Sequence, residues 1–107
     1  MEILSRSKRI AVPVVVIGEY RFGILRSRHR QAYERWLADW LAAVNVLPVE
    51  QATAQHYADV ALELKVIGKP IPQNDIWIAA LCRQYSLPLL SQDHPFDAVS
   101  GIERISW

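Results

Sequence analysis

Short apolar runs typical of buried strands alternate along this chain with longer stretches that repeat apolar residues at helical spacing. The helical pattern is clearest at 30–44, where Trp36, Leu37, Trp40 and Leu41 share one face. Strands alternating with helices favour an α/β fold with a mainly parallel sheet. The strands are expected at 9–12, 44–49, 87–91 and 102–107, and the helices at 13–28, 30–44, 50–68 and 74–86.

The size and composition of the chain predict one globular domain spanning residues 1–107. With 107 residues, 51% of them hydrophobic, it can build a core of its own. The net charge of +1 means that any nucleic-acid site must be a local patch. Cys82 is the single cysteine, which excludes an internal disulfide. No apolar run reaches the ~20 residues of a membrane span, and the first ten residues do not have the pattern of a secretory leader. We therefore expect a soluble, cytoplasmic protein.

Three acids stand at positions where carboxylates could carry chemistry. Glu19 interrupts an apolar helical segment, Asp75 opens a predicted helix, and Asp93 follows a predicted strand. Sites in parallel sheets form beyond the carboxyl ends of the strands, which selects the loop that contains Asp93. The chain has neither the Cys/His spacing of a zinc site nor a glycine-rich phosphate loop. Several carboxylates brought together bind a hard cation such as Mg²⁺ or Mn²⁺, and such ions promote phosphodiester hydrolysis.

Each of these acids also has a structural interpretation without chemistry. Asp75 or Asn74 can cap the helix that follows. Glu19 can be a solvated helix residue, and Asp93 can be a turn residue. The residue pattern alone leaves both interpretations open.

Three segments of the chain resemble PIN-domain proteins of the VapC toxin type. "VPVVVIGEYRFGILRS" is similar to the family's second-acid segment, which has the pattern E-[LY]-x-x-G. "GKPIPQNDIWIAALC" resembles its third-acid segment, in which a turn ending in N-D or G-D precedes a W-I-A-A helix. "LPLLSQDHPFDAVSGIERISW" resembles its C-terminal segment, in which an apolar strand leads into T-x-D-x-x-F. The order and spacing of the three segments fit the family from about residue 10 to residue 107.

This resemblance implies a three-layer α/β/α fold and a Mg²⁺- or Mn²⁺-dependent endoribonuclease, the toxin of a type II toxin–antitoxin system. Its partners would be RNA, a small antitoxin protein and a second copy in a homodimer. Glu19, Asp75 and Asp93 match the family's second, third and fourth acids, and would be the catalytic, metal-binding residues. Asn74, Ser91 and Asp97 are weaker candidates that would orient a carboxylate or a water molecule.

The N-terminal segment departs from the family pattern. Family members open with a strand ending in D-[TS]-[NS], which supplies the first acid, and a helix follows. Here "MEILSRSKR" is interpreted as the end of the next helix, so the chain is expected to be N-terminally truncated, with two strands lacking their central partner. Either the true start lies upstream or the toxin has decayed; a swapped segment is less favoured. The alternative function is therefore a catalytically defective remnant that binds antitoxin or RNA without cleavage.

Two further groups of side chains have an open interpretation. Arg21, Arg26 and Arg28 either form a rim that contacts RNA phosphates or are simply a solvated helix end. Trp36 and Trp40 are predicted to be partly buried at an interface, and Cys82 is predicted to lie in the core.

Overall fold

The computed structural model describes residues 2–4 and 10–106. Its strands are β1 (Glu2–Leu4), β2 (Ile10–Pro13), β3 (Asn45–Leu47), β4 (Leu89–Leu90) and β5 (Arg104–Ile105). Its helices are α1 (Val14–Leu25), α2 (Arg30–Ala43), α3 (Gln51–Val66), α4 (Gln73–Tyr85) and the short 3-10 helix η1 (His94–Ala98). All four helices and the four strands expected after residue 9 are confirmed, with shorter bounds for most of them.

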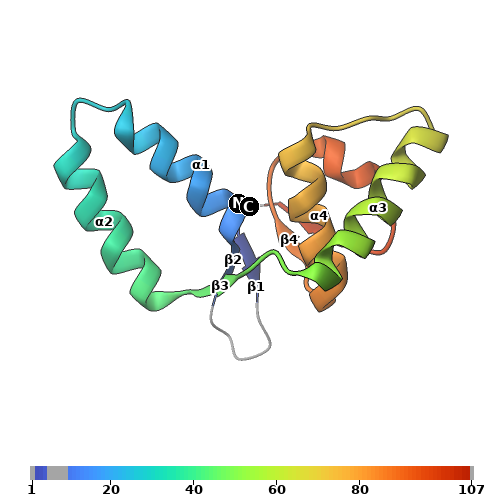
Figure 1. The fold of residues 1–107 in the computed structure, drawn as a ribbon, viewed down its shortest axis with the longest axis horizontal. Helices are drawn as coiled ribbons and strands as arrows, with labels where there is room; N and C mark the ends of the chain where they lie inside the picture. The colour runs from blue at the N-terminus through green and yellow to red at the C-terminus, as the bar shows by residue number, and fades with distance from the viewer. Residues whose placement is uncertain (1, 5–9, 107) are drawn as a thin grey trace.

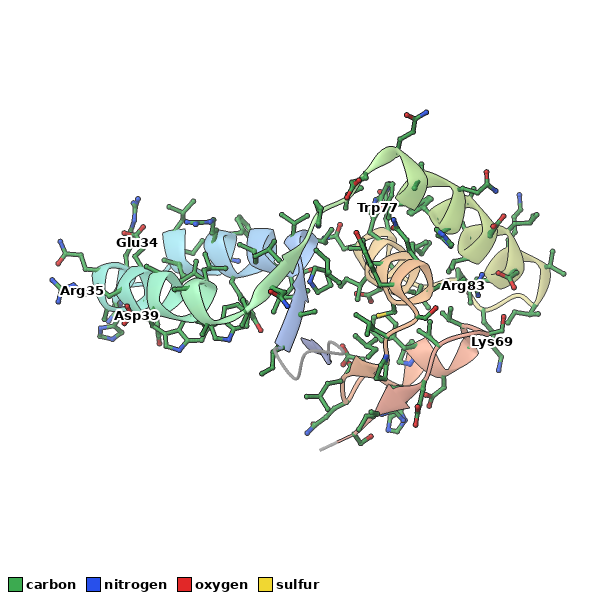
Figure 2. The ribbon with its side chains drawn as sticks, turned by 90° about the horizontal axis from the view of Figure 1, so that it is seen from below. Glu34, Arg35, Asp39, Lys69, Trp77 and Arg83 are labelled. Carbon is green, nitrogen blue, oxygen red and sulfur yellow. The ribbon has the colours of Figure 1, made fainter. Side chains whose placement is uncertain are left out.

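The helices form two pairs on opposite sides of the strands. Figure 1 shows α1 and α2 on one side of β1 and β2, and α3 and α4 on the other. The view turned by 90° shows the same division along the longest axis of the molecule, which measures 44 Å (Figure 2). The predicted α/β architecture is therefore confirmed. None of the helices in the described part of the chain is long and apolar enough to cross a membrane.

The five strands form one sheet in the order β3-β2-β1-β4-β5. The pairs β2–β3 and β4–β5 are parallel, as predicted for most of the sheet. In contrast, β1 runs antiparallel to both of its neighbours, with Ile3 opposite Ala11 on one side and Leu89 on the other. The carboxyl ends of β2 and β4 therefore lie at the same edge of the sheet.

The interpretation of the N-terminal segment as the end of a helix is wrong for residues 2–4, and its part on residues 1 and 5–9 lies outside the residues that the structure describes. Residues 2–4 form the central strand, so β2 and β4 do not lack a partner. The physical reason is that β2 and β4 each present backbone N–H and C=O groups that need partners, and β1 supplies them. Its direction follows from the connection: only five residues separate Leu4 from Ile10, whereas a parallel crossover needs about a dozen or more.

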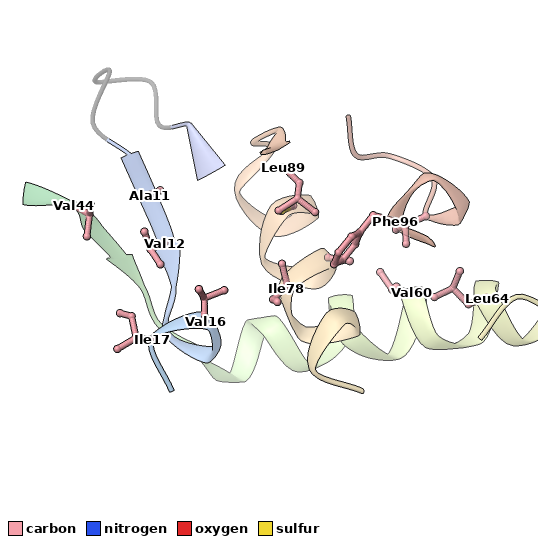
Figure 3. Close-up of a cluster of buried hydrophobic side chains, with 13 residues drawn as sticks. Ala11, Val12, Val16, Ile17, Val44, Val60, Leu64, Ile78, Leu89 and Phe96 are labelled. Atoms are coloured by element: carbon pink, nitrogen blue, oxygen red, sulfur yellow. The ribbon is translucent and has the colours of Figure 1, made fainter. Parts of the chain in front are cut away.

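One hydrophobic core joins the strands to α1, α3 and α4. Val12, Val16, Ile78 and Leu89 pack between β2, α1, α4 and β4, and Phe96 extends the core toward α3 (Figure 3). Each of these five side chains is at most 2% exposed. This packing makes the valine-rich segment helical despite its weak helix propensity. Cys82 is fully buried, as predicted, and burial raises the pKa of its thiol to about 12.

A polar contact fixes the start of α3 against α4. The backbone N–H of Glu50 donates to the Thr53 hydroxyl at 3.0 Å, and that hydroxyl donates to the Gln84 side chain at 2.7 Å. Thr53 is fully buried. Its hydroxyl thus caps α3 and links the start of α3 to the last turn of α4.

Candidate metal centre

The three predicted acids come from separate parts of the chain. Glu19 lies in α1, which follows the carboxyl end of β2, and Asp93 lies just beyond the carboxyl end of β4. Asp75 lies in the first turn of α4. The negative charges of Glu19 and Asp93 both act on the Asp75 carboxyl. The fold therefore places Glu19 and Asp93 near enough for their charges to affect the Asp75 carboxyl.

Asp75 is the most enclosed of the three acids. Burial raises the pKa of its carboxyl, and the charges of Glu19 and Asp93 raise the pKa further. The capping interpretation is wrong for both Asn74 and Asp75, because α4 begins at Gln73 and its N-cap residue is Pro72. The backbone rather than a side chain closes this end: the Asp75 N–H donates to the Pro72 carbonyl at 3.0 Å. The Asp75 carboxylate is thus left for another role, near a helix N-terminus that favours negative charge.

Asn74 contacts Glu19 and not its chain neighbour. Its side-chain amide donates to the Glu19 carboxylate at 3.4 Å, which links the first turn of α4 to α1. Both side chains are exposed. Asn74 directly precedes Asp75 in the sequence, and its amide contacts the Glu19 carboxylate. This arrangement fits the orienting role predicted for Asn74.

Ser91 acts on the backbone of Asp93. The Ser91 side chain is 2% exposed, and its hydroxyl accepts a hydrogen bond from the Asp93 N–H at 3.0 Å. Asp93 itself is exposed and precedes η1 as its N-cap residue. The hydroxyl therefore fixes the turn that presents Asp93 beyond the strand.

Asp97 is paired with an arginine. The Arg104 guanidinium donates to both of its carboxylate oxygens, at 2.7 Å and 3.1 Å. This contact lowers the pKa of the Asp97 carboxyl, and His94 at 3.6 Å contributes to the same shift. Arg104 also donates to the Ser91 carbonyl at 3.0 Å. Asp97 thus stabilises the loop that carries Asp93, and its carboxylate is already paired.

The chemistry of the acidic site suits a hard divalent cation. Its donors are carboxylate oxygens, which Mg²⁺ and Mn²⁺ prefer. A partly buried carboxyl with a raised pKa beside two like charges is relieved when a cation neutralises them. Within residues 2–4 and 10–106, however, no three Asp, Glu, His or Cys side chains converge closely enough to enclose an ion. Glu19, Asp75 and Asp93 fit such a cation in the type of their donor atoms.

A basic surface lies around the turn between α1 and α2. Arg21, Arg26 and Arg28 are all exposed, and the Arg26 guanidinium lies 5.3 Å from the centre of the Phe22 ring. Arg28 lines a surface hollow together with His29, Arg30 and Arg35. The sequence analysis missed Arg35. The one sequence feature that could have pointed to Arg35 is its position. It lies one helical turn after Gln31, in a helix whose start is already rich in basic residues.

An aromatic cluster lies between α1 and α2. The Trp36 and Trp40 rings stack with centroids 5.5 Å apart, and Tyr20 contacts both. Trp36 is 50% exposed and Trp40 is half-buried. The predicted partial burial is confirmed for Trp40, whereas Trp36 is exposed, and the predicted interface at this pair stays a prediction.

Comparison with known proteins decides the family. The PIN domain family matches residues 1–102 of the chain. The chain belongs to the PIN-domain family. The resemblance predicted from its three acid-bearing segments is therefore confirmed.

The relatives of this PIN domain are of the VapC type. It is 33% identical to Ribonuclease VapC5 of Mycobacterium tuberculosis, over 87% of this chain and 70% of the relative. It is 29% identical to Ribonuclease VapC2 of Haemophilus influenzae, over 100% of this chain and 85% of that protein. The solved structure of VapBC-1 from nontypeable Haemophilus influenzae matches its fold with a TM-score of 0.88, at 25% identity, over 97% of this chain and 78% of that one.

Proposed function

We propose that this PIN domain is the toxin of a type II toxin–antitoxin system and cleaves RNA as a Mg²⁺- or Mn²⁺-dependent endoribonuclease in the cytoplasm. The observation that carries the proposal is the raised pKa of Asp75, caused by burial and by the charges of Glu19 and Asp93, in a member of a family whose relatives are named ribonucleases.

Glu19, Asp75 and Asp93 would hold the metal. A bound Mg²⁺ or Mn²⁺ supplies a low-pKa water and stabilises charge on phosphate oxygens. Asn74 orients the Glu19 carboxylate, and Ser91 holds the turn that presents Asp93. Thr53 links the start of α3 to Gln84 in the last turn of α4, the helix whose first turn carries Asp75.

The basic surface would bind the RNA backbone. Arg21, Arg26 and Arg28 carry positive charge into solvent on the side of the molecule formed by α1 and α2. Their contacts with phosphates would position the substrate without reading its sequence. A chain of net charge +1 needs such a local surface to hold a polyanion.

The protein partner would be a small antitoxin. Solved neighbours of this fold are described as VapBC complexes. The half-exposed Trp36 and its stacked neighbour Trp40 are aromatic side chains of the kind that anchor interfaces. They would contact the antitoxin or a second copy of the chain in a homodimer.

The test is cleavage of a mixed structured RNA by the purified 107-residue chain. We expect cleavage with Mg²⁺ or Mn²⁺, none with EDTA, and none by Asp75→Asn. Asp59→Asn is the matched control and should cleave like the unsubstituted chain, because Asp59 is an exposed acid of α3 that bonds Gln55 and lies outside the three acids. A folded chain that binds RNA but does not cleave it in any metal would contradict the proposal.

That result would favour the second candidate function, a PIN remnant that binds RNA or antitoxin without cleavage. The observation behind this candidate is that no three acidic side chains of the described residues converge into a closed metal site. The two candidates differ in cleavage and agree in RNA binding.

A further inference from the structure

A surface hollow between α1 and α2 adjoins the candidate metal centre. Its volume is about 240 Å³, below the roughly 300–1,000 Å³ of pockets that enclose drug-sized ligands. It therefore suits one small, flat group. The described residues that line it are Glu19, Tyr20, Gly23, Ile24, Tyr33 and Trp36. Since Glu19 also belongs to the candidate metal centre, a ligand held at that centre can extend into the hollow.

The aromatic walls of the hollow are held in place by other rings. Trp40 stacks on Trp36 at 5.5 Å with an interplanar angle of 10°, and Tyr20 meets Trp36 edge-on at 6.1 Å. Tyr33 lies edge-on to His29 at 6.3 Å. Even so, Trp36 is 50% and Tyr33 is 47% exposed. The hollow thus offers preorganised aromatic surface that a ligand can reach.

Gly23 keeps one side of the hollow open. It is helical and does not have a positive φ, so its backbone conformation does not require glycine. Apart from its chain neighbours and the backbone of its own helix, none of the described residues lies within 4 Å of the position that a Cβ would take. Glycine is less favourable than alanine in a helix. Neither backbone conformation nor packing explains this glycine, whereas a ligand in the hollow would.

Positive charge lies beside the hollow. Arg26 is exposed, and its backbone N–H donates to the Gly23 carbonyl at 3.2 Å. Arg21 is also exposed and lines a neighbouring hollow together with Ile24. Phosphates that flank a group in the hollow would therefore lie near guanidinium groups. This charge favours a polyanion as the occupant.

We propose that the hollow binds one base of a single-stranded RNA, stacked on the Trp36 ring. This inference rests on the proposed ribonuclease function and adds a contact for the substrate of the same site. Bases of single-stranded RNA stack on aromatic side chains, and every base has a flat face that can do so. Apart from Glu19, the residues that line the hollow carry no charge. The contact is therefore tolerant of sequence and holds the strand beside the metal centre.

The experiment compares two single-stranded probes of equal length and charge. One is a uridine oligoribonucleotide, and in the other stable abasic sugars replace all nucleosides. The parent protein is the full chain with Asp75→Asn, so that the RNA stays intact, and fluorescence anisotropy measures both affinities. We expect the parent to bind the uridine probe roughly tenfold more tightly, the fold-change that the stacking of one base on an aromatic side chain supports.

Gly23→Leu is the variant that fills the hollow, and leucine is a better helix former than glycine. We expect it to lose the preference for the uridine probe and to bind the abasic probe as the parent does. The slope of log affinity against log salt concentration should not change, because no phosphate contact is lost. Gly18→Leu is the matched control and should keep the preference. Gly18 lies in the same helix with equally open space, and it does not line the hollow.

The outcomes separate this inference from the proposed function. If Gly23→Leu keeps the preference of the parent, the inference is overturned, and cleavage by the unsubstituted chain still tests the proposed function. If size-exclusion chromatography then shows a changed oligomeric state, a second copy of the chain occupies the hollow instead. If the parent binds neither probe, this inference and the proposed RNA binding both fail. Should Gly23→Leu lower the Tm, Tyr33→Leu takes its place, because it removes one exposed aromatic wall. An unchanged preference in that variant also overturns the inference.

Discussion

At the scale of single residues, Thr53 shows how one buried hydroxyl joins two helices. It accepts from the Glu50 N–H and donates to Gln84 while fully buried. Thr53→Val keeps the shape and leaves two polar partners unsatisfied, so we expect a loss of about 1–3 kcal/mol in the free energy of unfolding. Urea denaturation measures this loss. Thr53→Ser keeps the hydroxyl and should lose less, and an equal loss in both variants would show that the methyl group matters instead.

Asp75 and Asp97 have pKa shifts of opposite sign, which predicts opposite effects of neutralising them. The folded-state pKa of Asp75 is raised, so the folded chain binds a proton here more readily than the unfolded chain. The charged form of Asp75 therefore opposes folding at neutral pH, and stability is gained as pH falls through the raised pKa. We expect Asp75→Asn to raise the Tm at pH 7 in EDTA, and the gain to disappear at a pH below the ordinary carboxyl pKa.

Asp97 serves as the control, because its carboxyl pKa is shifted in the opposite direction to that of Asp75. Its pKa is lowered by Arg104, so it stabilises the fold above the ordinary carboxyl pKa and loses that contribution as pH falls through the lowered value. Asp97→Asn should therefore lower the Tm at pH 7 and have little effect in strong acid. Thermal melts of both variants across this pH range measure the two trends. Shifts of the same sign at pH 7 would contradict a raised pKa of Asp75 caused by burial and by the charges of Glu19 and Asp93.

At the scale of elements, β1 is the least expected part of the fold and gives a sharp prediction. Ile3 pairs with Ala11 and Leu89, so its backbone lies in the middle of the sheet. Proline has no N–H to donate and is excluded from central strands. We expect Ile3→Pro to cost at least one net backbone hydrogen bond, about 0.5–1.5 kcal/mol, and more if the whole strand detaches.

The control for this prediction is Ile3→Val, which keeps a β-branched residue in the strand. Chemical denaturation compares the free energies of unfolding of the two variants. Equal stability of the proline variant and the unsubstituted chain would mean that residues 2–4 do not pair in solution.

The difference between the expected and observed elements has a clear physical origin. The pattern in 30–43 predicted α2 well, because Leu37 and the tryptophans repeat at helical spacing and pack on one face. Residues 2–4 are too few to show a period, and their strand is imposed by the unpaired edges of β2 and β4. The expected helix over 13–28 ends at Leu25, where the Arg26 N–H bonds back to Gly23 at the C-cap.

At the scale of the whole molecule, the sequence could name the acids but not their surroundings. Glu19, Asp75 and Asp93 are separated by tens of residues, and only the fold brings their charges to bear on one another. The pairing of Asp97 with Arg104 depends on a loop returning to β5, which no local pattern encodes. Likewise, the contact of Asn74 with Glu19 arises from the approach of α4 to α1.

The two helix pairs lie at opposite ends of the molecule. Charge reversals in the basic surface at one end can therefore be compared with charge reversals at the other end. Arg26 and Arg28 belong to the end formed by α1 and α2, whereas Lys69 lies at the far end beyond α3, as the labels of Arg35 and Lys69 in Figure 2 show. Because the net charge is +1, a charge reversal at either end changes the total charge equally. Only a local contact with RNA can make the two ends differ.

We expect the double variant Arg26→Glu/Arg28→Glu to bind RNA more weakly than the unsubstituted chain. The slope of log affinity against log salt concentration should also become smaller, by about 0.7 for each phosphate of a single-stranded RNA that the variant no longer neutralises. Lys65→Glu/Lys69→Glu carries the same charge change at the other helix pair and should retain most of the affinity and the slope. Both variants are made in an Asp75→Asn background so that the RNA stays intact, and fluorescence anisotropy at several salt concentrations gives the slopes. Equal reductions in the two variants would mean that the RNA senses only the total charge, and that Arg26 and Arg28 are a solvated helix end.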